Sequence, residues 1–196
     1  MTLLFAAETH TYTVDGIVRP SVTEIMAPLY DWSRVPLDVL ETARERGVAV
    51  HRALELLDRN ELDENSVDPR IDGYIDAYLN FVASRGAIEW ILIECPLYHR
   101  TLGYAGTPDR YGYVDGMLTV LDFKTTATMM PQFSVQLSGY TSLISSTHEP
   151  PKQAMCLRLL RNGTFELKIE SPVAALPIFM SCLTLYKWRK ANACIN

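Results

Sequence analysis

Two adjacent residues, Asp115 and Gly116, place the strongest constraint on the fold of this chain. They separate two runs that favour β-strands, at about 103–114 and 117–124. Asp-Gly readily adopts the positive φ angles of a two-residue type I′ turn, which joins antiparallel strands. Such a turn also fixes the register, because residues pair outward from it one by one. The sequence therefore predicts an antiparallel hairpin whose facing residues can be counted.

Counting outward from the turn places Asp109 opposite Asp122, and Thr107 opposite Lys124. Directly opposed residues have Cβ atoms about 4.5–5.5 Å apart. Asp122 and Lys124 are two positions apart, so they share one face of their strand. Two carboxylates and one ammonium group are therefore expected on one small patch of the sheet.

Like charges that face each other across a ladder repel. A divalent cation between Asp109 and Asp122 would remove that repulsion, and oxygen ligands suit Mg²⁺ or Mn²⁺. Two other interpretations stay open at this point. The hairpin can be an exposed one with a surface Lys–Asp ion pair, and a β-bulge can shift the register by one residue.

The rest of the chain follows a mixed α/β pattern. An opening hairpin turns at Asp15-Gly16, and Ser21 or Thr23 is a candidate cap for a short helix after it. Apolar spacing and turn residues predict the remaining elements: helices at about 36–58, 69–85, 131–146 and 174–191, and strands at about 88–99, 103–114, 117–124, 153–161 and 164–169. The expected fold is a central mixed β-sheet flanked by helices.

Length and composition fit one globular unit. The chain has 196 residues, of which 48% are hydrophobic and 21% charged, so we expect a single domain over residues 1–196. No apolar run reaches the roughly 18 residues of a membrane span, and the N-terminus has no basic segment ahead of its short apolar stretch. A cytoplasmic protein is expected, or one in the host cytoplasm if a phage encodes it.

Charge and cysteine usage narrow the chemistry. The net charge of −5 argues against a large basic face for nucleic acid, but not against an acidic site that metal neutralises. The cysteines stand at positions 95, 156, 182 and 194, with no C-x-x-C pair. We therefore expect reduced thiols, and neither a zinc site nor an iron–sulfur cluster.

The hairpin residues resemble a known signature. G-T-P-D at Gly106–Asp109, followed by D-F-K at Asp122–Lys124, is similar to the motif of PD-(D/E)XK nucleases. In that superfamily the motif lies on two adjacent antiparallel strands, as the register count also predicts. The resemblance implies a restriction-endonuclease-like core.

Further segments resemble the RecB-like subgroup of this superfamily. Gly47–Glu55 is similar to its G-x-x-x-H-x-x-L-E helix, and Gln136–Tyr140 to its Q-x-x-x-Y helix. Glu94 and Pro96 resemble an acidic strand that precedes the G-T-P-D segment, and the opening hairpin with Pro20–Ile25 resembles small RecB-like exonucleases, including phage proteins. Members that hold an iron–sulfur cluster carry a cysteine quartet, which is absent here.

The resemblance implies a role for each matching residue. The implied ligands of Mg²⁺ or Mn²⁺ are His51, Asp109, Asp122 and the Phe123 carbonyl, with Glu94 as a further candidate. The other implied catalytic residues are Lys124, Gln136 and Tyr140. Lysine would act on the attacking water and on developing charge, whereas the glutamine and tyrosine would support the site and contact DNA. Glu55 is either a neighbour of the site or a solvated acid, and Arg100 and Arg110 are candidate phosphate contacts.

The implied function is a metal-dependent exonuclease that acts on DNA with free ends in recombination, repair or phage DNA metabolism. Such an enzyme can have recombination or repair proteins as partners. Three alternatives stay open. One is a structure-specific or restriction-like endonuclease, and another is a non-catalytic nucleic-acid-binding protein with the same fold. The third is an unrelated α/β interaction module that matches the motif by chance.

Overall fold

The central sheet has five strands in the order β10-β9-β8-β7-β4 in the computed structural model, which describes residues 1–192. The strands are β4 (Ile88–Ile93), β7 (Arg110–Val114), β8 (Met117–Lys124), β9 (Gln153–Leu159) and β10 (Phe165–Glu170). Strands β8 and β9 run parallel, whereas the other neighbours are antiparallel. The predicted mixed sheet is therefore confirmed.

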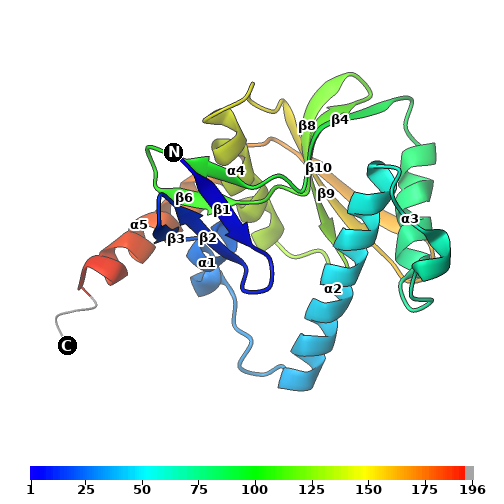
Figure 1. Ribbon diagram of the computed structural model, residues 1–196, viewed down its shortest axis with the longest axis horizontal. Helices are drawn as coiled ribbons and strands as arrows, with labels where there is room; N and C mark the ends of the chain where they lie inside the picture. Colours follow the sequence, from blue (N-terminus) through cyan, green and yellow to red (C-terminus); the bar gives the residue numbers. More distant parts are fainter. Residues whose placement is uncertain (193–196) are drawn as a thin grey trace.

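Helices cover both faces of this sheet (Figure 1). They are α1 (Val22–Ile25), α2 (Leu37–Asp58), α3 (Asp72–Ala83), α4 (Gln132–Ser145) and α5 (Leu176–Asn192), with short 3₁₀ turns η1 (Ala27–Leu29) and η2 (Glu64–Ser66). Helices α2 and α3 pack on one face and α4 on the other, and α5 packs against α4. The four longer helices lie where the sequence pattern predicts them, with ends shifted by at most a few residues.

Strand β8 divides its side chains between two cores. Leu118 and Val120 point into the core that α4 covers, while Leu121 and Phe123 point into the core under α2 and α3. Because side chains alternate along a strand, Asp122 follows Val120 onto the α4 face. The strand therefore delivers its charged end to α4.

Two turns behave as the sequence predicts. Asp115 and Gly116 have φ angles of 51° and 77°, as a type I′ turn requires. Ser21 caps α1, because its hydroxyl accepts the backbone N–H of Glu24 at 2.9 Å. The predicted register of the β7–β8 hairpin also holds, from Val114 opposite Met117 to Arg110 opposite Leu121.

The two strands predicted at 88–99 and 103–114 are wrong in their extent. Each is broken, and the released pieces β5 (Leu97–His99) and β6 (Tyr104–Gly106) pair with each other in a separate sheet. Pro96 and Pro108 lie at the breaks, where proline has no N–H for a ladder.

The predicted pairing of Thr107 with Lys124 is consequently wrong. Thr107 lies in the break between β6 and β7, and its hydroxyl is 2.7 Å from the hydroxyl of Tyr12. Tyr12 belongs to a three-stranded sheet of β1 (Leu3–Ala6), β2 (Thr11–Val14) and β3 (Ile17–Arg19). The sequence pattern did not predict β1.

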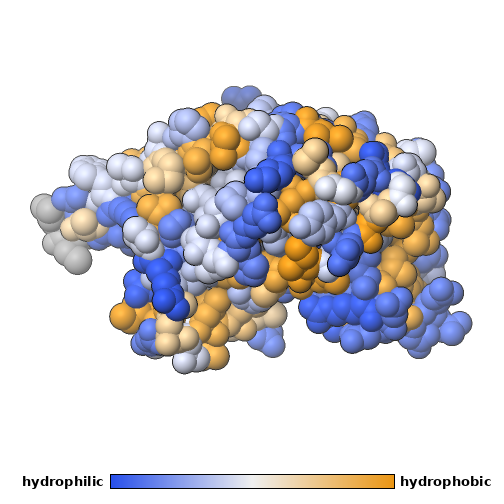
Figure 2. Space-filling model, turned by 90° about the horizontal axis from the view of Figure 1, so that it is seen from above, coloured by the Kyte–Doolittle hydropathy of each residue, from blue (hydrophilic) through white to orange (hydrophobic). Residues whose placement is uncertain are grey.

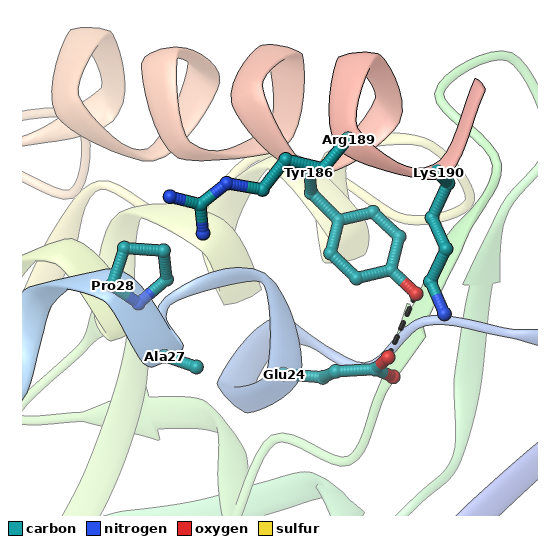
Figure 3. Close-up of a pocket in the computed structure, with 6 residues that line it drawn as sticks. All are labelled: Glu24, Ala27, Pro28, Tyr186, Arg189 and Lys190. Carbon is teal, nitrogen blue, oxygen red and sulfur yellow. Dashed lines mark hydrogen bonds between the residues drawn. The ribbon is translucent and has the colours of Figure 1, made fainter. Parts of the chain in front are cut away.

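Helix α5 also holds α1 in place. The Tyr186 hydroxyl donates to Glu24 at 2.7 Å, across a cavity of about 560 Å³ that Arg189 and Lys190 also line (Figure 3). At the centre of α4, Gly139 lets the Phe179 ring of α5 approach, since a Cβ there would lie 2.7 Å from that ring. Helix α5 therefore supports both α1 and α4 from outside.

The surface is mixed in polarity, and the described cysteines are not paired with one another. Figure 2 shows hydrophobic and hydrophilic residues interleaved over one face of the molecule. Among residues 1–192, no helix is long and apolar enough to cross a membrane. Cys95, Cys156 and Cys182 are free thiols, and Cys194 lies outside the described residues.

Candidate metal centre and active site

The candidate site lies where β8 runs past the beginning of β7. The ladder between the two strands stops at Arg110 and Leu121, so Asp109 stands one step beyond it, level with Asp122. The Asp109 carboxylate bends back to β8 and accepts the backbone N–H of Phe123 through Oδ2 at 2.6 Å. A buried carboxylate therefore replaces a strand neighbour at this point.

The same geometry frees the Phe123 carbonyl from the β7 ladder. In a strand, the N–H and C=O of one residue project toward the same edge. The Phe123 N–H points to Asp109, so its carbonyl points to the edge that β7 no longer occupies. The structure thus places this oxygen on the side of the Asp109 carboxylate.

Donor groups of three residues, His51, Glu94 and Asp109, lie close together. His51 Nδ1 lies 3.4 Å from Asp109 Oδ1 and 3.4 Å from Glu94 Oε1. One donor atom from each of the three residues lies within 4.8 Å of the others. Helix α2 supplies His51, while Glu94 follows β4 in a left-handed conformation with φ 44° and donates its N–H to the Asp109 carbonyl.

A second polar row extends from Asp122 into α4. Lys124 Nζ lies 2.6 Å from Asp122 Oδ2 and 2.9 Å from Gln136 Oε1. Gln136 Nε2 in turn donates to the Tyr140 hydroxyl at 3.1 Å. The two positions are four apart on α4 and therefore share one face. The structure thus brings the strand end at Asp122–Lys124 into contact with the Gln136–Tyr140 segment of α4.

The pKa values of the three carboxyl groups, Asp122, Glu94 and Asp109, shift in different directions. Burial raises the pKa of Asp122 to about 6, with Asp109 adding to the shift against the effect of Lys124. Burial likewise raises the pKa of Glu94 to about 7. Burial acts in the same direction on Asp109, but His51, Lys124 and the Phe123 N–H outweigh it and hold its pKa below the usual range.

The two basic groups retain their protons. Burial alone would lower the pKa of His51, but Asp109 and Glu94 outweigh it and raise this pKa to about 10. Burial also opposes the charge of Lys124, yet Asp122 and Asp109 raise its pKa above the usual value. Without metal, both groups are cations that neutralise the surrounding carboxylates.

The donor set fits a hard divalent ion. Its carboxylate oxygens and backbone carbonyl are the ligands that suit Mg²⁺ and Mn²⁺, and one imidazole nitrogen lies beside them. Asp122 Oδ1 is buried and has no hydrogen-bond partner among residues 1–192. A buried acceptor without a partner is costly, and a cation beside it would supply the missing interaction.

A buried arginine lies beneath this cluster. Arg110 is fully buried, with Nε 2.6 Å from Asp58 Oδ2 and Nη1 2.6 Å from the Asp109 carbonyl. Its Nη1 also lies 3.7 Å from Glu94 Oε1. Tyr78 donates to Asp58 at 2.8 Å, which completes a polar network behind the carboxylates.

The burial of Arg110 corrects one sequence-based interpretation. Arg110 cannot contact a phosphate from a position with no exposed surface, so that interpretation is wrong. Glu55 pairs with Arg52 at 2.6 Å and with Arg59 at 3.0 Å, both on its own helix α2. The pairing of Arg110 with Asp58 had no signal in the sequence, because the two residues are 52 positions apart.

Comparisons with known proteins give only distant similarity. No protein-family model and no curated protein matches the chain. The crystal structure of an alkaline exonuclease, LHK-Exo from Laribacter hongkongensis, is similar with a TM-score of 0.42 and 9% identity, over 89% of this chain and 94% of that one. The structure of SSO0001 is similar with a TM-score of 0.35 and 12% identity, over 74% of this chain and 69% of that one. Values this low say nothing about activity.

Proposed function

We propose that this protein is a metal-dependent nuclease that hydrolyses phosphodiester bonds of DNA. The observation that supports this most is the position of Lys124. Its ammonium group is held by Asp122 and Gln136 at the same strand end where His51, Glu94 and Asp109 converge. Carboxylates, imidazole and a fixed ammonium group at one strand end suit phosphoryl chemistry better than nucleic-acid binding alone, because carboxylates repel phosphate.

Asp109, Asp122, His51 and the Phe123 carbonyl would hold Mg²⁺ or Mn²⁺, with Glu94 beside them. The bound ion would lower the pKa of a water molecule and neutralise charge on the phosphate. His51 lies 3.4 Å from both Glu94 and Asp109, whereas Asp122 pairs with Lys124. The proposal therefore requires Asp122 to share its carboxylate between Lys124 and the ion.

Lys124 would act on the reacting groups as a cation. In hydrolysis, the oxygen of water forms a bond to phosphorus, one ester P–O bond breaks, and the leaving oxygen ends with a proton. The Lys124 ammonium can donate hydrogen bonds to the attacking water and to a phosphate oxygen whose negative charge grows in the transition state. Its raised pKa keeps this donor charged at neutral pH.

Gln136 and Tyr140 would hold the lysine in place. Both side chains are largely buried, at 7% and 6% exposed, so their shared hydrogen bond is protected from water. Gln136 accepts from Lys124 and fixes the direction of the ammonium group. The resemblance to RecB-like enzymes adds contact with the substrate near the scissile phosphate as a proposed second role.

We further propose exonuclease action on DNA with free ends, which the similarity of the Q-x-x-x-Y segment to RecB-like exonucleases supports. The test is digestion of end-labelled single- and double-stranded DNA in Mg²⁺, Mn²⁺ and EDTA, with closed circular DNA in parallel. Metal-dependent shortening of linear strands with intact circles is expected. Cut circles would indicate an endonuclease instead, and no cleavage of any substrate would contradict the nuclease proposal.

A further inference from the structure

A second cavity opens beside Lys124, which forms part of its lining. Its volume is about 420 Å³, within the usual range for small-ligand sites. Its polar lining comes from Lys124, Gln136 and two threonines, and its apolar lining from four larger side chains: Tyr30, Trp32, Met130 and Phe133. The cavity therefore borders the proposed reaction centre directly.

One wall of the cavity is a pair of parallel aromatic rings. Tyr30 and Trp32 stack with ring centroids 5.3 Å apart and planes only 11° from parallel. Trp32 remains 47% exposed, which is unusual for so large an apolar side chain. An exposed ring that is already aligned by a second ring offers a flat surface for another planar group.

Lys124 and Phe133 line the same cavity as these rings. Lys124 Nζ lies 5.0 Å from the centre of the Phe133 ring, within cation–π range. The backbone ahead of Tyr30 is tied to α4, because Gln132 Nε2 donates to the Leu29 carbonyl at 3.1 Å. The aromatic pair is thereby fixed relative to the helix that also positions Lys124.

We propose that this cavity is a nucleobase subsite, in which an unpaired base stacks on Trp32 and Tyr30 while its phosphate lies at Lys124. This inference rests on the proposed nuclease function and names the form of DNA that the site accepts. The two faces of a base inside a duplex are covered by its neighbours, so only an unpaired or flipped base can stack on protein rings. The expected substrate is therefore a single strand or a frayed end.

Binding without cleavage tests this subsite. The probe is a fluorescent oligothymidylate in Ca²⁺, and its intact length is checked afterwards on a gel. An abasic oligomer of equal length and charge serves as the matched ligand, so any difference in affinity reports the bases alone. The variants are Trp32→Ala and Trp32→Phe. The control is Trp188→Ala, which changes an exposed tryptophan elsewhere, in α5.

The wild type should prefer oligothymidylate to the abasic oligomer. Stacking of a base on an aromatic side chain is worth about 1–3 kcal/mol, so Trp32→Ala should weaken oligothymidylate binding by about 5- to 150-fold. Its binding of the abasic oligomer should not change. Trp32→Phe should keep most of the preference, and Trp188→Ala should behave as the wild type.

Equal binding of the two oligomers by the wild type would overturn the subsite, and so would a full base preference in Trp32→Ala. These outcomes are separate from failure of the proposed function. A protein that shows the base preference but never cuts DNA in Mg²⁺ or Mn²⁺ would support the subsite and refute the nuclease. A protein that cuts DNA, but whose Trp32→Ala variant keeps the full preference for oligothymidylate, would support the nuclease and refute the subsite.

Discussion

Lys124 donates to Gln136 across 2.9 Å, and this bond links the end of the central strand β8 to helix α4. The same ammonium group lies 2.6 Å from Asp122 and 5.0 Å from the Phe133 ring centre. A lysine side chain is normally mobile and loses substantial rotamer entropy when fixed. Three partners offset that cost here and hold one positive charge at a defined position beside the carboxylates.

Lys124→Ala should abolish cutting while metal binding is retained. Loss of a group that stabilises transition-state charge commonly lowers the rate by about 10²–10³-fold. The measurement is the cleavage rate at saturating Mn²⁺, together with the Mn²⁺ dissociation constant by calorimetry. Lys152→Ala, at an exposed lysine, is the control and should leave both values unchanged. A near wild-type rate for Lys124→Ala would remove this residue from the mechanism.

His51→Ala should weaken metal binding and raise the Mg²⁺ concentration needed for activity. The imidazole is one of three donor groups within 4.8 Å of each other, so its loss should cost at least about tenfold in affinity. Titration with Mn²⁺ measures this directly. His148→Ala changes a half-buried histidine outside the metal cluster, which contacts Thr147 and the Tyr111 ring, and it should bind Mn²⁺ normally. Unchanged affinity in His51→Ala would exclude His51 as a ligand.

Gln136→Ala should lower the rate or the DNA affinity at saturating metal, without shifting the metal requirement. The ammonium group of Lys124 loses an acceptor, and misplacement of a reacting group costs about tenfold or more. Tyr140→Phe should have a smaller effect, because it removes only the partner of Gln136. Thr141→Val on the same helix is the control, since its buried hydroxyl has no hydrogen-bond partner within the described residues 1–192. An increase in the Mg²⁺ requirement alone would contradict this assignment.

Much of the site was predictable because one turn fixes it. Asp115-Gly116 sets the register, and the count holds as far as the pair of Arg110 and Leu121, so that the neighbouring Asp109 reaches the Phe123 N–H. The count fails at Thr107, because the ladder ends at Arg110 and Thr107 contacts Tyr12 instead. Local turn chemistry therefore predicts the hairpin but not the point at which its strands separate.

The burial of Arg110 was not predictable from local pattern. An arginine next to Asp109 suggests a solvated phosphate contact, whereas the structure buries it completely against Asp58 of α2. Such pairs depend on how a distant helix packs, which hydrophobic spacing does not specify. The aromatic pair of Tyr30 and Trp32 was missed for the same reason, since its cavity forms only when η1 meets α4.

The stabilising effect of metal should increase with pH. The fold raises the pKa of Asp122 from 3.8 to about 6, of Glu94 from 4.5 to about 7, and of His51 from 6.5 to about 10. Each group stabilises the fold at pH values below its pKa in the unfolded chain. This contribution is lost as the pH rises through its pKa in the folded protein. Metal binds the deprotonated groups and replaces those protons. The Tm increase caused by Mn²⁺ should therefore be larger at about pH 8 than at about pH 5.5; an equal or smaller increase at the higher pH would contradict this.

Arg110→Met should destabilise the fold strongly. It leaves Asp58 and Glu94 without their buried cation, and breaking a buried ion pair costs about 3–5 kcal/mol. The free energy of unfolding from urea denaturation measures the loss. Arg70→Met, which breaks an exposed pair with Asp68, should unfold as the wild type does. A loss as small as that of the control would show that the buried network does not support the carboxylates.

The most direct test of the proposed site is the return of DNA cleavage when Mn²⁺ is added to metal-stripped protein, for the wild type and Asp122→Asn in parallel. Asp122 is 1% exposed and its Oδ1 has no hydrogen-bond partner within residues 1–192. Asparagine has nearly the same size as aspartate, so the substitution removes the charge and changes the packing little. The stripped wild type should be inactive and regain activity with Mn²⁺, whereas folded Asp122→Asn should stay inactive. Undiminished cleavage in EDTA, or a wild-type rate in Asp122→Asn, would contradict the account.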